Sequence, residues 1–350
     1  MTLSPLRALI LRKLLKINRS YREVSERTWV LSAAESRISP PAFYREEDLA
    51  RVTATMGDTN IAYEMSRIRG GRSEHGATVA YELRDVHLID GALYKGAMMK
   101  QLVRRPRRYM ARDVPVTTGP VALVGTFYGS VYFGHWITDD LTLQLAAESL
   151  APPFIADRPS YGHEPGYCKL LGIDQHRLSD ARFDRLIMLD DVGQNAYKRR
   201  RYAELRDRLQ KSAPSSGSEL VYIRRGSAGA RERRSLMNIE AVESYLESQG
   251  FVIVDPDRLS AAEIAASIVG ASVVVGVEGS HMAHAIYAVR EGGALCMMQP
   301  PYRFNNVFKD YADCLAFAYS FTVGTEVSGG FTVDLGDLER VITKVRTGGA

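Results

Sequence analysis

Several features that would place this chain in a specialised class of protein are scarce or absent. Its 350 residues include only three cysteines, Cys168, Cys296 and Cys314, at wide spacings. Three cysteines at these spacings predict neither a disulfide framework nor a zinc site. Because no disulfides are expected, we expect the protein to reside in a reducing compartment. No apolar run approaches the roughly 18 to 20 residues that a membrane-spanning helix needs, and no secretory cleavage pattern follows the first residues. These absences predict a soluble or membrane-peripheral protein.

The sequence also lacks the common nucleotide-binding motifs and any large excess of one charge. No G-x-G-x-x-G follows a strand and no Walker loop is present, which argues against a nicotinamide enzyme and a nucleoside triphosphatase. The chain has 45 Lys and Arg against 41 Asp and Glu, and residues 1–30 alone carry a net charge of +5. Basic runs occur at 104–108 and 198–201. Because no base-reading or stacking motif accompanies these runs, we expect no nucleic-acid partner.

What the N-terminus does contain is a basic amphipathic pattern from Leu3 to Tyr21. Apolar residues recur at helical spacing, namely Leu3, Leu6, Ile10, Leu14 and Ile17. Cations lie between them, namely Arg7, Arg12, Lys13, Lys16 and Arg19. Such a helix can lie in a membrane interface with its cations on anionic headgroups, or its apolar stripe can pack on the body of the protein. Residues 1–22 are therefore a candidate contact with an anionic membrane surface.

The second half of the chain alternates strands and helices. We expect strands at 220–223, 251–254, 272–277 and 294–298, and helices at 238–249, 260–269 and 281–289. Ser260 followed by Glu263 predicts a capping box at the start of the second helix. Strict alternation of this kind predicts an α/β fold with a parallel, doubly wound sheet and with ligands at the carboxyl ends of its strands.

The first half is expected to be α/β as well. A hairpin is predicted around Asp90 and Gly91, and a short strand at 120–124 precedes a helix at 135–150. The serine-rich segment at 212–219 is the best linker candidate. We therefore predict a basic segment at 1–30, one α/β domain at 31–212, a second α/β domain at 213–325 and a tail helix within 326–350.

Two loops at the carboxyl ends of the predicted C-terminal strands are rich in polar residues. The first carries clustered arginines, among them Arg224, Arg225, Arg231 and Arg234. Guanidinium groups bind phosphate in a bidentate manner, so this loop is a candidate diphosphate site, although a solvated basic loop would have the same composition.

The second polar loop is VEGSHMAHA at 277–285. Gly279 allows close approach of the backbone, and amides from Ser280 onward would face an anion at the start of a helix. Glu278 could accept hydrogen bonds from ribose or sugar hydroxyls. His281 and His284 could donate to a phosphate or be satisfied within the helix.

The segment FGHWITDD at 133–140 combines a histidine with two carboxylates. On a helix His135 and Asp139 share a face, so the carboxylate can orient the imidazole as a general base. Asp140 would lie slightly around the helix. Local spacing supplies no third metal ligand. Alternatively, His135 packs at the helix start and the aspartates interact with the positive end of the helix dipole.

Together these segments resemble family 61 glycosyltransferases. The resemblance covers about residues 120–320 and includes FGHWITDDLTLQL, the arginines after the strand at 220–223, Asn238 before the next helix and the Gly-Ser loop. It implies a GT-B-like architecture of two Rossmann-like doubly wound domains facing a cleft, with 31–212 as the acceptor-side domain and 213–325 as the nucleotide-sugar-binding domain. It also implies an inverting mechanism without an essential metal or other cofactor, and a nucleotide-sugar donor, with UDP as the expected nucleotide. Glu278-Gly279 stands where many eukaryotic members have His-Gly, and His284 where Asn is common.

The hypothesis is a single displacement at the anomeric carbon. His135, oriented by Asp139 or Asp140, would deprotonate an acceptor hydroxyl across the cleft, while Arg224, Arg225 and the amides after Gly279 would neutralise the departing diphosphate. The resemblance points to a bacterial enzyme of capsular or surface polysaccharide synthesis. Such an enzyme would be cytoplasmic or peripheral at the inner face of the membrane, and oligomers are compatible with the sequence. The alternative is a non-catalytic glycan- or nucleotide-binding protein on the same fold.

Overall fold

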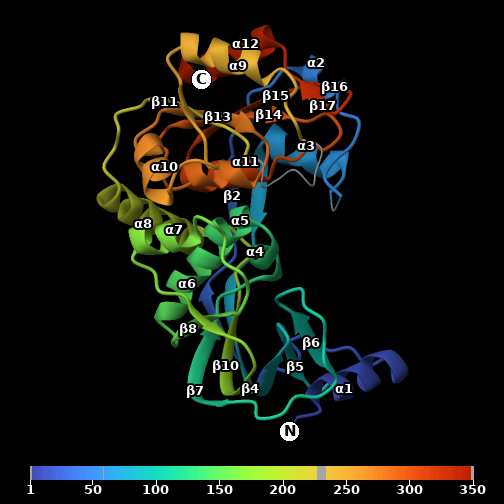
Figure 1. Cartoon of the computed structure of the whole chain (residues 1–350). Helices are drawn as coiled ribbons and strands as arrows, with labels where there is room; N and C mark the ends of the chain where they lie inside the picture. The colour runs from blue at the N-terminus through green and yellow to red at the C-terminus, as the bar shows by residue number, and fades with distance from the viewer. Residues whose placement is uncertain (1, 58, 227–233, 348–350) are drawn as a thin grey trace. The chain divides into compact units, whose positions relative to one another are not determined.

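The computed structural model describes residues 2–57, 59–226 and 234–347, and its α-helices and β-strands form an α/β protein (Figure 1). The chain divides into two units. The first unit comprises residues 1–35, 74–168 and 173–201, and the second comprises 36–73, 169–172 and 202–350. The boundary near the middle of the chain falls after Arg201, inside a helix, rather than in the serine-rich segment. None of the helices in the described ranges is long and apolar enough to cross a membrane.

The first unit contains a mixed sheet in the order β6-β5-β4-β10-β7-β8-β9, with β1 also paired to β4. Its strands are β1 (Arg27–Ser32), β4 (Thr78–Ile89), β5 (Ala92–Lys95), β6 (Met98–Gln101), β7 (Val116–Leu123), β8 (Pro153–Ala156), β9 (His176–Leu178) and β10 (Ala181–Asp190). The pairings among β10, β7, β8 and β9 are parallel, whereas those of β4 with β1, β5 and β10 are antiparallel.

This mixture departs from the doubly wound parallel sheet expected for the first half. The cause is local. Asp90 and Gly91 adopt φ values of 49° and 71°, as a tight two-residue hairpin turn requires, and the turn reverses the chain between β4 and β5. The hairpin predicted at these two residues is therefore confirmed, and it makes β5 antiparallel to β4.

The sheet of the first unit is buried on both faces around β7 and β10. Leu186 and Met188 of β10 pack into one apolar cluster, and Ile187 between them packs into another on the opposite face. Side chains that follow one another along a strand point to opposite faces, so both faces must be covered. The helices of this unit are α1 (Ser4–Leu9), η1 (Ile10–Leu14), α4 (Phe127–Val131), α5 (Phe133–His135), η2 (Trp136–Asp140) and α6 (Leu141–Glu148). Two further helices, α7 (Glu164–Leu171) and α8 (Ala196–Ser212), run across the unit boundaries.

The N-terminal helix is shorter than its sequence pattern predicts. It ends as a π-helical turn at Leu14, and Lys16 takes a left-handed φ of 56° that ends the helix. Only Pro5 and Ala8 of the helical residues are buried. Four of the five residues of the predicted apolar stripe are exposed, with Leu14 at 73%, whereas Leu6 is half-buried and Ala8 packs on β5.

The second unit is built on a parallel sheet in the order β12-β11-β13-β14-β15. Its strands are β11 (Leu220–Ile223), β12 (Val252–Val254), β13 (Val273–Val277), β14 (Ala294–Gln299) and β15 (Ala318–Val323). Figure 1 shows α9 (Ile239–Ser248) and α12 (Leu335–Arg346) on one side of this sheet, and α10 (Ala261–Ile268) and α11 (Val307–Leu315) on the other. The predicted alternation and the Ser260–Glu263 capping box are confirmed. The chain reverses its direction of winding between β11 and β13, where parallel α/β sheets bind ligands.

Two features of the second unit differ from expectation. The helix expected at 281–289 is a 3₁₀-helix, η4 (Ser280–Ala285). The unit also takes in residues 36–73, which contain α2 (Glu46–Leu49) and α3 (Ile61–Arg69). These residues are held by main-chain hydrogen bonds from Phe43 to β15 and by Glu64, which accepts a hydrogen bond from the Asn306 amide at 2.6 Å. Two small sheets, β2 (Glu35–Ser39) with β3 (Gly71–His75) and β16 (Thr325–Val327) with β17 (Gly330–Thr332), complete the strands described.

Candidate functional site

His135 and Asp139 of the first unit are in direct contact. His135 ends α5, and Asp139 lies in the π-helical turn η2 that follows. The imidazole Nδ1 lies 2.8 Å from Asp139 Oδ2. A hydrogen bond at Nδ1 fixes the tautomer and leaves Nε2 as the basic nitrogen. The His135 side chain is 31% exposed, so a substrate hydroxyl can reach it.

Asp139 is held in turn by a buried lysine. Lys198, only 3% exposed, donates from Nζ to Asp139 Oδ1 at 3.1 Å and to the Asp191 carbonyl at 3.1 Å. Burial by itself would raise the pKa of Asp139, but the charge of Lys198 and the bond with His135 lower it to about 2. The carboxylate is therefore ionised at neutral pH. It can stabilise a positive charge that develops on the imidazole of His135.

Asp191 extends the hydrogen-bond network of His135, Asp139 and Lys198. Its carboxylate accepts hydrogen bonds from Arg201 at 2.7 and 3.0 Å and from Thr78 Oγ1 at 2.7 Å. Lys198 and Arg201 belong to the basic run at 198–201, and both are buried and paired. Two of the four cations of that run are therefore unavailable to a nucleic acid.

Asp140 has a different role from its neighbour. Its side chain is buried and accepts hydrogen bonds from the Thr126 amide at 3.0 Å and the Thr126 hydroxyl at 2.8 Å. Burial raises the pKa of Asp140 well above its usual range. Of the two aspartates that could orient His135, the structure brings only Asp139 to it, and Asp140 holds the start of α4.

Lys198 was missed by sequence reasoning, although a signal was present. It stands four residues before Tyr202 on α8, and Tyr202, Leu205 and Leu209 are fully buried at helical spacing. A lysine on the apolar face of an amphipathic helix must find a buried partner, since an unpaired buried charge is costly. The adjacent arginines masked this pattern because they make the segment look uniformly solvated.

In the second unit, the loops after β11 and β13 meet around Gly279. A Cβ placed on Gly279 would lie 2.4 Å from Arg225 Nη1, 3.0 Å from Arg234 Nη1 and 3.2 Å from His281 Nδ1. Only glycine leaves room for these side chains to approach the backbone so closely. Of the residues singled out in the sequence, the structure thus brings together Arg225, Arg234, Gly279 and His281, at the point where the sheet changes its direction of winding.

Glu278 does not offer a free carboxylate to a sugar. It is 3% exposed and accepts hydrogen bonds from Arg234 at 2.9 Å, Arg303 at 2.7 Å and Asn305 at 2.9 Å. These partners occupy both carboxylate oxygens. Glu278 therefore positions two guanidinium groups, and Arg303 and Asn305 join the cluster as residues that sequence reasoning had not singled out.

Arg224 and Asn238 are likewise occupied by contacts within the fold. Arg224 forms a bidentate pair with Glu243 on α9, at 2.7 Å for both bonds, and donates to Asp255 at 2.9 Å. Asn238 bonds with both the carbonyl and the amide of Val333. In the structure Arg224 ties the end of β11 to α9 and Asp255, and Asn238 ties the start of α9 to Val333, so neither presents free donors. Arg231 lies outside the described residues.

The two histidines of the second loop are both deeply placed. Burial and the charge of Arg225 lower the pKa of His281 well below its usual range, so its imidazole is neutral. Its Nε2 is buried without a hydrogen-bond partner among the described residues. His284 is 3% exposed within η4, and Ser280 begins that helix. Nowhere in the described ranges do three or more His, Cys, Asp or Glu side chains gather as a metal site.

Comparisons with known proteins bear on one part of the chain. Residues 133–300 match the family model described as Glycosyltransferase 61, and this match supports a glycosyltransferase enzyme, which would bind a sugar donor and an acceptor. The matched segment begins two residues before His135 and includes Lys198, Arg225 and Gly279. No curated protein matches the chain. Among solved structures, the H90D mutant of the flavo di-iron protein from Thermotoga maritima is similar at 12% identity, with 60% of this chain and 51% of that chain covered. Its TM-score is 0.28, too low to inform the fold or function.

Proposed function

We propose that this protein transfers a glycosyl group from a nucleotide-sugar to an acceptor hydroxyl, with His135 as the general base. The observation that carries the proposal is the contact between His135 and Asp139. Lys198 holds Asp139 in place by donating a hydrogen bond to its other carboxylate oxygen. A histidine with a fixed tautomer, an ionised carboxylate partner and a partly exposed ring is the arrangement that deprotonation of a hydroxyl requires. The family match over residues 133–300 supports glycosyl transfer as the reaction class.

The proposed step is a single displacement. Nε2 of His135 takes the proton of the acceptor hydroxyl while the oxygen forms a bond to the anomeric carbon. The bond from that carbon to the donor diphosphate breaks at the same time, and the nucleoside diphosphate leaves with the electron pair. Throughout the step, Asp139 accepts a hydrogen bond from Nδ1–H of His135. Its negative charge stabilises the imidazolium that forms. Because the nucleophile and the leaving group lie on opposite sides of the carbon, the configuration inverts.

The donor diphosphate is proposed to bind beside Gly279 in the second unit. Arg225 and Arg234 supply guanidinium groups there, and Glu278 holds Arg234 and Arg303 in place. Permanently charged groups can neutralise a departing diphosphate without a metal, so the proposed mechanism is metal-independent. Arg224 is given an indirect role, since Glu243 and Asp255 hold its side chain.

The finer assignments belong to the same proposal. They are a GT-B-like arrangement in which the two units face a common cleft, a UDP-linked donor, and an acceptor that is a bacterial surface or capsular polysaccharide or its precursor. The expected location is the cytoplasm or the inner face of the membrane. These assignments rest on the resemblance of the sequence to family 61 enzymes.

Nucleotide binding tests the donor site. Thermal unfolding is measured with UDP, GDP, CDP, ADP and TDP, each in EDTA and in Mg²⁺. A ligand at 100 times its dissociation constant should add about 2.7 kcal/mol to the free energy of unfolding. We expect one diphosphate to stabilise the protein equally in EDTA and in Mg²⁺.

Two arginine variants locate the binding site. Arg225→Gln should lower the affinity for the nucleotide, whereas its neighbour Arg224→Gln should lower stability and leave the affinity nearly unchanged. Binding that persists in Arg225→Gln would refute the assignment of the diphosphate site. Binding of a diphosphate without transfer or donor hydrolysis would favour the non-catalytic alternative.

A further inference from the structure

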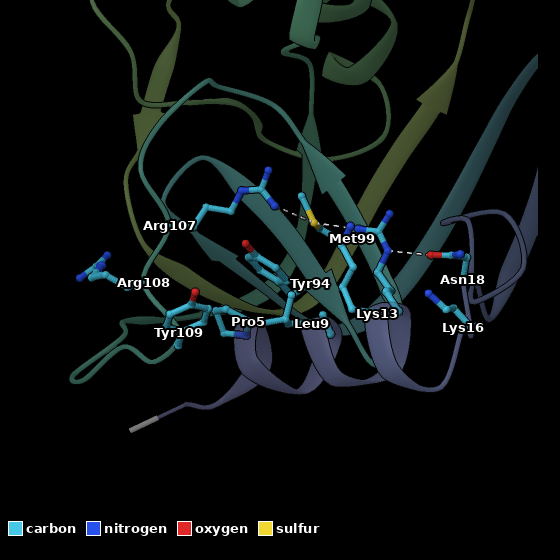
Figure 2. A pocket seen from close by; sticks show the side chains of 12 residues that line it. Pro5, Leu9, Lys13, Lys16, Asn18, Tyr94, Met99, Arg107, Arg108 and Tyr109 are labelled. Carbon is cyan, nitrogen blue, oxygen red and sulfur yellow. Dashed lines mark hydrogen bonds between the residues drawn. The ribbon is translucent and has the colours of Figure 1, made fainter.

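The first unit contains a pocket that the proposed glycosyl transfer does not use. It has a volume of about 660 Å³ and lies between the N-terminal helix, the hairpin of β5 and β6, and the segment at 107–109 (Figure 2). Five cations line it, namely Arg12, Lys13, Lys16, Arg107 and Arg108, and none of its lining residues is acidic. A pocket with this lining has a strongly positive potential and favours an anionic ligand.

Four of the five cations have no carboxylate partner in the described part of the chain. Arg108 is paired with Asp90 and Asp180 and is thereby neutralised. Arg12 and Arg107, in contrast, both donate to the thioether sulfur of Met99, at 2.8 and 3.3 Å. A thioether is a weak acceptor, so two guanidinium groups converge on one point with no anion between them. A phosphate bound beside the Met99 sulfur would accept bonds from both groups and reduce their mutual repulsion.

The pocket also has an apolar part. Pro5, Leu9, Tyr94 and Met99 belong to its lining. Burial raises the pKa of Tyr94 in spite of the nearby guanidinium groups, so its hydroxyl stays protonated. The lining thus combines apolar surface with cations, which suits an amphiphile better than a free inorganic ion.

The N-terminal segment carries further exposed apolar side chains next to these cations. Leu14 is 73% exposed and Leu15 is 59% exposed, and Tyr109 on the facing segment is 61% exposed. Exposed apolar residues close to one another and flanked by Lys and Arg are typical of segments that lie in a membrane interface.

We propose that this pocket binds the phosphate headgroup of an anionic membrane lipid. Arg12 and Arg107 would hold the phosphate, Lys13 and Lys16 would add to the attraction, and Leu14 and Leu15 would enter the acyl region. The proposal does not depend on the glycosyl-transfer hypothesis, because none of its residues belongs to the His135 or Gly279 clusters.

The test compares two double variants that remove the same charge. Arg12→Gln with Arg107→Gln removes the converging pair from the pocket. Arg7→Gln with Arg112→Gln removes two exposed cations of the same unit that do not line the pocket. Binding of the full chain is measured by cosedimentation with phosphatidylcholine vesicles, with and without phosphatidylglycerol.

We expect binding only when phosphatidylglycerol is present. At about 1 kcal/mol for each cation near the surface, the pocket variant should bind about thirtyfold more weakly. The affinity of the control variant for these vesicles should fall much less. Arg12→Lys with Arg107→Lys keeps both charges and should retain most of the binding, which separates loss of charge from loss of folding.

Three results would overturn the proposal. Equal weakening by the two Gln variants would mean diffuse attraction rather than a site. Failure of the wild-type chain to bind phosphatidylglycerol vesicles would exclude the lipid. Stabilisation by inorganic phosphate in a thermal-unfolding assay, without vesicle binding, would identify the ligand as a soluble phosphate.

Discussion

Replacement of Lys198 by Met removes the cation that holds Asp139 against His135. Lys198 is 3% exposed and lies 3.1 Å from Asp139 Oδ1. Burial opposes ionisation of Asp139, yet Lys198 and His135 together lower its pKa from 3.8 to about 2. A pKa lowered by this much corresponds to about 2.5 kcal/mol of interaction with the ionised carboxylate. We therefore expect Lys198→Met to lower the free energy of unfolding at pH 7 by about 2 kcal/mol.

The pH dependence of this loss has a definite sign. A carboxyl whose pKa is depressed in the folded state contributes stability above its unfolded pKa and loses that contribution as the pH falls through its folded pKa. The contribution of Asp139 is thus complete above about pH 4 and disappears towards about pH 2. Wild type and Lys198→Met should differ most at neutral pH, and the difference should narrow below pH 4.

Urea unfolding at several pH values measures this difference. Lys211→Met is the matched control, because Lys211 is an exposed lysine in the last turn of the same helix. Turnover of Lys198→Met should fall about tenfold or more, since a misplaced Asp139 orients the imidazole poorly. If the variant matched Lys211→Met in stability at pH 7 and kept its turnover, the electrostatic support of Asp139 by Lys198 would be refuted.

The remaining predictions concern the base and the helix start beside it. His135→Ala should lower turnover by about 10²-fold or more while nucleotide affinity is nearly kept, as measured by product formation and by thermal shift. A collapse of nucleotide binding in that variant would contradict the assignment of His135 as the base. Gly129→Ala should destabilise the protein by about 1 to 3 kcal/mol in urea unfolding, because its Cβ would overlap the buried Asp140 carboxylate. Gly162→Ala, with open space around the added Cβ, is the control, and equal stability of the two variants would disprove the tight packing of Asp140 against α4.

Local patterns in the sequence were sufficient for most of the second unit. The strand predicted at 220–223 has the bounds of β11, and α10 begins at the predicted capping box. The hairpin at Asp90 and Gly91 was also predictable, because a tight turn depends on the φ values that its own two residues can adopt. In each case the deciding interactions lie within a few residues along the chain.

The pattern was insufficient where local signals were ambiguous. The N-terminal repeat of apolar residues predicted one helix from Leu3 to Tyr21, but the helix ends at Leu14 and most of the stripe is exposed. The segment expected to be a helix at 281–289 forms a 3₁₀-helix instead. The spacing of apolar residues indicates which of them would share one face of a helix. It does not indicate whether another part of the protein packs against that face.

For the candidate site, the sequence by itself determined the chemistry that could be present, namely a histidine beside two aspartates and arginines after a strand. The tertiary structure decided which of these groups meet. Lys198 reaches Asp139 from 59 positions away along the chain, and Glu278 is saturated by Arg234, Arg303 and Asn305. Such pairings depend on which charges the fold removes from water, because a charge withdrawn from solvent is tolerated only beside a partner. That selection is a property of the packed chain, so no spacing rule along the sequence could have made it.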